Sequence, residues 1–330
     1  MTVDSAGRLV DLGEARALIE AGATLAVAGD AELLAQLPKG NWIGGSTPYF
    51  MADDGGTCRN DRLFVHRFDL GEGTIQRYDR ESLPSLLVDA PENGFTLLIL
   101  PAGSGVLEDY AHHAPTYHDM FLKPVAGWVS GVRVDRLGQD AALVVDGRSG
   151  EQLAQEAIAL HLALPADMTA MVHAISLFEP GDGAEIEFPA TGFSATDCLI
   201  DGRPGNLREY MAAAGIDQRL PLVADYCGAM VNVSIQGVDE GAQRVAFYAP
   251  VFEGVRYRFA KPVVDYPERF LEAMPSEPGT LLFGCNCILN YLYSELEGRR
   301  TAGLTGPITF GEVAYQLLNQ TAVYVTLEPA

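Results

Sequence analysis

The residues best suited to chemistry are gathered in the last fifty positions of this 330-residue chain. The run Leu281–Cys287, LLFGCNC, predicts a buried strand, and Cys285 and Cys287 lie where that strand ends. Farther along, Glu312 lies in an apolar stretch directly after a glycine. A carboxylate in such surroundings needs either a partner or a function.

These thiols and this carboxylate fit more than one role. In an enzyme, Cys285 or Cys287 would be the nucleophile and Glu312 the acid or base, although the sequence supplies no base for the thiol. In a structural role, both cysteines are small buried apolar groups. Glu312 would then favour the first turn of a helix predicted for 313–319, while in a binding protein it would face a ligand.

Two glycine-rich turns, Ile43–Phe50 and Leu304–Phe310, each lie beside a predicted strand. Glycine lets a ligand approach the backbone closely, and free N–H groups at such a bend can hold an anion. We expect the two turns to face each other across one pocket. The candidate ligand-binding residues are Gly44, Gly45, Ser46, Thr47, Tyr49, Cys285, Asn286, Phe310, Gly311 and Glu312.

Half of the six histidines lie within seven residues, at His112, His113 and His118. With Asp109 they could hold a transition metal or ligate haem iron. Their spacing matches no zinc signature, and adjacent histidines usually point apart on a helix, so surface histidines are the alternative. We therefore favour the interpretation in which these histidines bind no metal, and the sequence does not identify a cofactor.

Composition narrows the class of protein. Twenty-two basic and 44 acidic residues give a formal charge of −22, which disfavours binding to nucleic acids and anionic lipid surfaces. No apolar run is long enough to span a bilayer, and the N-terminal residues lack the pattern of a secretory signal. Five cysteines, an odd number, fit a reducing compartment. We expect a cytoplasmic protein.

Local patterns predict a mixture of helices and strands. Asp11, Asp30 and Ser104 are suited to cap helices, and Gly215 to end one. The clearest predicted strands are Thr24–Gly29, Phe95–Ala102 and Val125–Val132; the predicted helices include Arg80–Ala90, Leu207–Gly215, Tyr266–Pro275 and Ile288–Arg300, and Glu156–Leu164 fits either type.

This mixture predicts an α/β or α+β fold in which mixed sheets are covered by helices. No low-complexity linker divides the chain, and the most natural boundary follows the helix at Leu207–Gly215. We therefore expect two domains, 1–216 and 217–330, as two related halves of a layered α-β sandwich.

The order of several motifs resembles the FIST domain family, in both its N-terminal and its C-terminal halves. The matching segments, in order, are GRPGNLREYM, VFEGVRYRF, LLFGCNC, GPITFGEV and LLNQTAVYVTL. The chain differs from the family in two places: it lacks the arginine that follows the motif at Cys285, and Pro48 to Phe50 replace a glycine-glutamate element. These differences identify it as a divergent member.

The resemblance implies a bacterial sensory protein that binds a small ligand without catalysis and acts through a separate signalling partner, as a monomer or an oligomer. Some family members bind haem as gas sensors, which makes a haem or metal sensor the first alternative. An enzyme that uses Cys285 or Cys287 with Glu312 is the second. The sequence names neither the ligand nor the partner.

Overall fold

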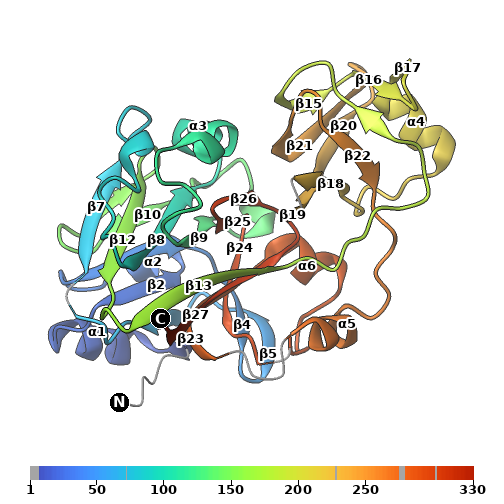
Figure 1. Ribbon diagram of the computed structural model, residues 1–330. Coiled ribbons are helices and arrows are strands. Elements are labelled where there is room, and N and C mark those ends of the chain that lie inside the picture. The colour runs from blue at the N-terminus through green and yellow to red at the C-terminus, as the bar shows by residue number, and fades with distance from the viewer. Residues whose placement is uncertain (1–6, 72, 227–228, 275–278, 302) are drawn as a thin grey trace.

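A computed structural model describes residues 7–71, 73–226, 229–274, 279–301 and 303–330. In this part of the chain the fold is mixed α/β, as predicted. Figure 1 shows a larger lobe and a smaller lobe, and the smaller one contains β14 to β22 together with α4. The chain passes from the larger lobe into the smaller one after β13 and returns before α5.

Three mixed sheets build the larger lobe. The first has the order β1 (Arg8–Val10), β6 (Leu63–Arg67), β2 (Leu25–Gly29), β3 (Trp42–Ser46), β10 (Val144–Asp146) and β11 (Glu151–Leu153). The second has the order β26 (Gln316–Leu318), β25 (Glu312–Ala314), β9 (Val125–Ser130), β8 (Gly94–Pro101), β12 (Ala157–Ala163) and β7 (Thr74–Tyr78). The third has the order β13 (Met168–Ile175), β27 (Ala322–Pro329), β23 (Thr280–Cys287), β24 (Gly306–Thr309), β4 (Tyr49–Ala52) and β5 (Gly55–Cys58).

Parallel pairs occur once in each of these sheets, as β2 with β3, β8 with β9, and β23 with β24. One cluster of buried apolar side chains joins the three sheets, including Ile43, Phe64, Ile99, Leu160, Phe283 and Val325. The larger lobe is therefore a single packed body, although its strands come from both ends of the chain.

The smaller lobe is built from two antiparallel sheets. One has the order β17 (Arg203–Asn206), β16 (Asp197–Ile200), β14 (Ile186–Glu187), β22 (Arg256–Phe259), β18 (Leu222–Tyr226) and β19 (Ala229–Val233), and the other has the order β15 (Gly192–Ala195), β21 (Arg244–Val251) and β20 (Ile235–Asp239). The predicted boundary at 216/217 falls inside this lobe. Helix α4 before the boundary and β18 after it share one core cluster, with Leu207 and Leu222 among its members.

The helices are short. They are α1 (Leu12–Glu20), α2 (Ala31–Leu34), α3 (Gly105–His113), α4 (Leu207–Ala214), α5 (Tyr266–Ala273) and α6 (Ile288–Tyr293), with single 3₁₀ turns at Leu83–Ser85, Ala114–Thr116 and Val134–Arg136. Helices α1 and α3 pack their buried side chains against the faces of the first and second sheets, respectively. The predicted caps are confirmed: Asp11, Asp30 and Ser104 each accept a backbone N–H from the first helical turn. Gly215 ends α4 with a left-handed φ of 63°.

The segment Glu156–Leu164, which fitted either type, contains the strand β12, because it pairs with β7 on one side and β8 on the other. Several other predicted elements differ in the structure. The helix predicted for Ile288–Arg300 ends at Tyr293, just before Glu295 adopts a φ of 51°. The helix predicted for Arg80–Ala90 is reduced to the 3₁₀ turn at Leu83–Ser85. The Asp79 carboxylate accepts the Ser82 N–H, and the Ser82 hydroxyl accepts the Asp79 N–H, and such local bonds favour a turn. Residues 312–318 form the hairpin β25–β26 rather than a helix.

Polar contacts connect the two lobes at the turn before β27. The Asn232 amide of the smaller lobe donates to the Asn319 carbonyl at 3.0 Å. The Ser234 hydroxyl donates to the Gln320 side-chain oxygen at 2.8 Å. Gln320 in turn donates to the Arg219 carbonyl at 3.2 Å. All but Arg219 are buried, so these bonds form inside a closed contact and fix how the lobes meet there.

Candidate functional site

The two glycine-rich turns predicted to share a site lie side by side. Strand β24 pairs with β4, and the Thr47 hydroxyl donates to the Ile308 carbonyl at 2.7 Å. The turns therefore pack directly against each other rather than across a pocket. Two separate cavities lie next to the turns.

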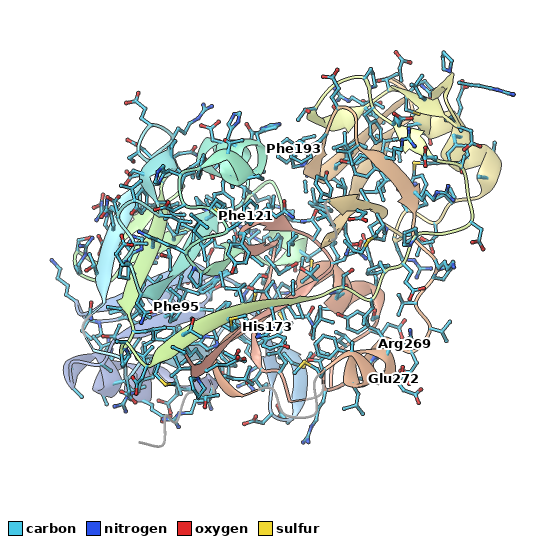
Figure 2. All side chains as sticks on the ribbon, viewed as in Figure 1. Phe95, Phe121, His173, Phe193, Arg269 and Glu272 are labelled. Carbon is cyan, nitrogen blue, oxygen red and sulfur yellow. The ribbon has the colours of Figure 1, made fainter. Side chains whose placement is uncertain are left out.

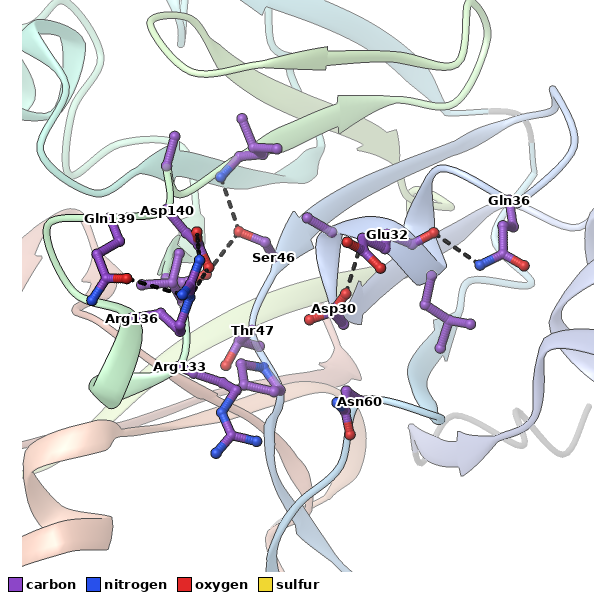
Figure 3. A pocket seen from close by; sticks show the side chains of 17 residues that line it. Asp30, Glu32, Gln36, Ser46, Thr47, Asn60, Arg133, Arg136, Gln139 and Asp140 are labelled. Atoms are coloured by element: carbon purple, nitrogen blue, oxygen red, sulfur yellow. Dashed lines mark hydrogen bonds and ion pairs between the residues drawn. The ribbon is translucent and has the colours of Figure 1, made fainter.

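The first cavity, which we call the strand-end pocket, lies where the parallel strands β2 and β3 end (Figure 3). Its volume is about 690 Å³, and its lining includes Asp30, Glu32, Ser46, Thr47, Asn60 and Arg133. Carboxyl ends of parallel strands are where open α/β sheets usually bind ligands. The sequence prediction thus placed Ser46 and Thr47 correctly beside a cavity.

The hydroxyls of Ser46 and Thr47 are already used within the fold. Ser46 Oγ donates to the Gly131 carbonyl at 2.8 Å and accepts the Leu143 N–H at 2.9 Å. These bonds hold the loop between β9 and β10 over the end of β3. The two residues therefore form the floor of the pocket. The side chains at its rim are the ones available to contact a ligand.

Charges at the rim are separated, as Figure 3 shows. Arg133 and Arg136 lie on one side, where each forms a two-point ion pair, with Asp135 and with Asp140 respectively. Glu32 lies on the other side, and its exposed carboxylate has no hydrogen bond or ion pair within the described residues. The pocket thus offers one unpaired carboxylate opposite two neutralised guanidinium groups.

The second cavity, the interlobe pocket, lies between the two lobes and has a volume of about 510 Å³. The larger lobe contributes Leu107 of α3, Gln155 and Phe310, and the smaller lobe contributes Phe193, Gln236 and Tyr248. Figure 2 shows Phe193 reaching from the smaller lobe toward α3, where its ring meets that of His112 edge-on at 5.1 Å. The loop residues Gly131, Val132, Asp140 and Ala141 border both pockets.

Glu312 lies in the core of the larger lobe, with no exposed surface, and lines neither pocket. One carboxyl oxygen accepts the Thr321 hydroxyl at 2.8 Å, and the other lies 3.1 Å from the Thr309 hydroxyl. Burial raises its pKa to about 8, although the bonds from Thr321 and Thr309 act in the opposite direction. The predicted helix-capping role is wrong, because Glu312 begins the strand β25.

The geometry around Thr309 also indicates a protonated Glu312. The Thr309 hydroxyl lies within hydrogen-bonding distance of two acceptors. They are the Glu312 carboxyl oxygen at 3.1 Å and the Asn286 carbonyl at 3.3 Å. One hydroxyl proton cannot serve two acceptors. A proton on Glu312 resolves the conflict, since Glu312 then donates to Thr309 and Thr309 donates to Asn286.

Cys285 and Cys287 are buried at the end of β23, as predicted, and are free thiols. Burial, together with the nearby Glu312, raises the pKa of both thiols well above the usual value. A thiol that stays protonated is a poor nucleophile, and neither thiol lines the strand-end pocket or the interlobe pocket. The pattern fits small buried groups within the core.

Of the other predicted ligand-binding residues, Phe310 is partly buried and lines the interlobe pocket, and the rest are buried in the fold. A side chain at Gly44 would meet Trp42, and one at Gly45 would meet Trp128, so both glycines make room for tryptophans. Gly311, Asn286 and Tyr49 are buried as well. The Tyr49 hydroxyl accepts the Val134 N–H at 3.0 Å and so anchors the loop that borders both pockets.

The histidine cluster does not form a metal site. His112 bonds to the Glu108 carbonyl, and His118 pairs with Asp119. Within the described residues, no three His, Cys, Asp or Glu side chains gather closely enough to hold a metal ion. His66 and His161, outside this cluster, are buried core residues with hydrogen-bond partners.

Sequence reasoning missed most of the pocket walls. Gln155, Gln236 and Tyr248 lie in unremarkable stretches, and only the folded chain brings them together. The loop after β9 offered a usable signal, because it follows a predicted buried strand and begins with glycine at Gly131.

The chain matches the model of one protein family. The model of a family described as "Family of unknown function (DUF6976)" matches residues 10–328. A search of curated proteins finds no match. Within the described residues, no helix has the length and apolar character that crossing a membrane requires.

Proposed function

Because the chain belongs to this family of unknown function, we propose its role from its geometry: it is a non-catalytic protein that binds a small polar molecule in the strand-end pocket. The observation that carries this proposal is the position of that pocket at the carboxyl ends of β2 and β3. A sensory role of FIST type, in the cytoplasm and through a separate partner, extends the proposal from the sequence resemblance.

The ligand's chemistry follows from the lining. Charged, amide and hydroxyl side chains dominate the rim, and the Glu32 carboxylate and the exposed Asn60 amide have no hydrogen bond within the described residues. A polar molecule with hydrogen-bond donors would pair with both. The volume of about 690 Å³ lies within the usual range for small-molecule sites.

The function is tested by native mass spectrometry of the full chain as purified, together with its UV-visible spectrum. We expect a co-purifying small molecule, or a rise in melting temperature with members of a panel of polar metabolites. The spectrum tests the haem alternative directly, because haem would give a Soret band. No bound mass and no melting shift with any panel member would contradict the proposal.

A charge reversal at the rim locates the site. We expect Glu32→Arg to weaken ligand binding about tenfold or more, equivalent to about 1.4 kcal/mol, because it removes an unpaired acceptor. Glu209→Arg is the matched control, since both residues are exposed, belong to the first turn of a helix, and have a capped backbone N–H. Equal binding by both variants, measured by titration calorimetry, would place the ligand elsewhere.

A further inference from the structure

The interlobe pocket differs from the strand-end pocket in chemistry. Aromatic and aliphatic side chains form its walls, with Leu107 and Phe310 on the larger lobe and Phe193 and Tyr248 on the smaller one. The ring of Phe310 lies over Gly131, where any side chain would collide with it. Such rings offer flat apolar faces to a bound molecule.

Several polar side chains in these walls have no hydrogen-bond partner within the described residues. The side chains of Gln155, Gln236 and Glu108 make no hydrogen bond or ion pair within the described residues, and neither does the Tyr248 hydroxyl. Most ligand pockets combine an apolar lining with a few polar groups that orient the ligand. The interlobe pocket has this composition.

The charges of the lining indicate which ligand the interlobe pocket would accept. Glu108 lines it without an ion pair within the described residues, Asp140 lines it while paired with Arg136, and no lysine or arginine is among the lining residues. The whole chain carries a formal charge of −22, which adds to the negative potential. An anion would therefore be repelled, while a neutral or cationic molecule would be accepted.

We propose that the interlobe pocket is a second ligand site, which takes a flat aromatic molecule, neutral or positively charged, between the two lobes. The ligand's ring packs between Phe310 on one lobe and Phe193 and Tyr248 on the other. Its polar groups bond to Gln155 and Gln236. Since both lobes contribute walls, occupancy adds contacts across the gap and holds the lobes in the closed arrangement.

The probe for this site is thioflavin T, a flat aromatic cation whose fluorescence rises when its rotation is restricted. The full chain should bind it at one saturable site, and the anionic aromatic dye 1-anilinonaphthalene-8-sulfonate at least about tenfold more weakly. No saturable binding of thioflavin T up to about 1 mM, or tighter binding of the anionic dye, would overturn the proposal.

Two sets of variants place the probe in the pocket. Ala154→Trp fills the cavity and should weaken thioflavin T binding about tenfold or more, whereas Ala213→Trp, on an exposed face of α4, should leave it unchanged. At the exposed Gln236, Gln236→Lys should weaken binding and Gln236→Glu should strengthen it, each severalfold. Insensitivity of binding to both sets would overturn the assignment.

The proposal for the strand-end pocket and the proposal for the interlobe pocket can be tested separately. Glu32→Arg, which changes only the strand-end pocket, should leave thioflavin T binding unchanged, and Ala154→Trp should leave the polar ligand's binding unchanged. Hydrogen exchange gives a further readout, because thioflavin T should slow exchange in β15 and in α3, which face each other across the pocket. Slower exchange in α2 instead would show that the dye occupies the strand-end pocket and overturn the assignment.

Discussion

At the scale of single residues, Glu312 shows how burial decides the role of a chemically capable group. Its position after glycine in an apolar stretch marked it as unusual from the sequence alone. The structure then places it among Thr309, Thr321 and two protonated thiols, out of reach of either pocket. Because burial raises the pKa of Glu312, we expect the stability of the protein to depend on pH.

The pH dependence follows from the proton that Glu312 holds in the folded state. The folded pKa is raised to about 8 from the ordinary value of 4.5, so this group's contribution to stability is fully present below about pH 4.5. The contribution is lost as pH rises through 8, by at most about 1.4 kcal/mol for each pH unit. Buried His66 and His161 have lowered pKa values and make stability rise with pH up to about 6.5, so the Glu312 effect stands apart only above that range. We expect the melting temperature to fall between pH 7 and pH 8.5.

Glu312→Gln should flatten this decline, because the amide keeps the shape of the protonated carboxyl and does not titrate. Glu209→Gln, at an exposed position, should leave the decline unchanged. Melting curves of the three proteins across this pH range measure the effect. A wild-type melting temperature that rises over the same range would contradict a protonated Glu312.

At the scale of elements, helix α3 links local sequence to the interlobe pocket. Ser104 Oγ accepts the Leu107 N–H and donates to the Pro101 carbonyl at 2.6 Å, so it joins the end of β8 to the first turn of α3. Leu107 of that turn lines the pocket. The cap therefore positions one wall of the interlobe pocket.

Replacing the cap should cost stability of the larger lobe. We expect Ser104→Ala to destabilise it by about 1–2 kcal/mol, since it removes a cap whose oxygen also bonds to β8. Asn206→Ala, which removes the cap of α4, should act on the smaller lobe. Hydrogen exchange in each lobe separates the two effects, and unchanged protection of α3 in Ser104→Ala would contradict this role.

Elements that depend on local signals could be predicted, and those that depend on distant partners could not. Caps at Asp11, Asp30 and Ser104 are local hydrogen bonds, so the sequence showed them. The segment 312–318 has an apolar pattern that fits a helix, yet β25 pairs with β9, nearly two hundred residues away in the chain. Pairing at that distance overrides local preference.

The same limit applies to the candidate site. Ser46 and Thr47 were predicted because a glycine turn beside a strand is visible locally. The walls formed by Phe193 and Tyr248 come from a lobe that folds separately, and no local pattern relates them to Phe310. Glu312 was misjudged as a helix cap or a ligand-facing group because a sequence does not show which unusual carboxylates end in the core.

At the scale of the whole molecule, the turn at 319–321 connects the two lobes. Asn232 reaches it from the smaller lobe, while Thr321 in the same turn bonds to Glu312 in the larger one. We expect Asn232→Ala to cost about 1–3 kcal/mol of stability, because it leaves buried carbonyls without a donor. Chemical denaturation of the full chain measures this cost.

The control for this prediction is Gln236→Ala, which lies on the neighbouring strand at an exposed position. It should leave the denaturation midpoint unchanged. Equal midpoints for Asn232→Ala and the wild type would show that the contact adds no net stability.

The place of β27 in its sheet also bears on how the chain is made. This strand pairs with β13 on one side and β23 on the other, so the larger lobe lacks an inner strand until residues 322–329 have been synthesised. The smaller lobe, from β14 to β22, is continuous and complete long before then. On the ribosome it should fold first, while the earlier strands of the larger lobe wait for their partners to emerge.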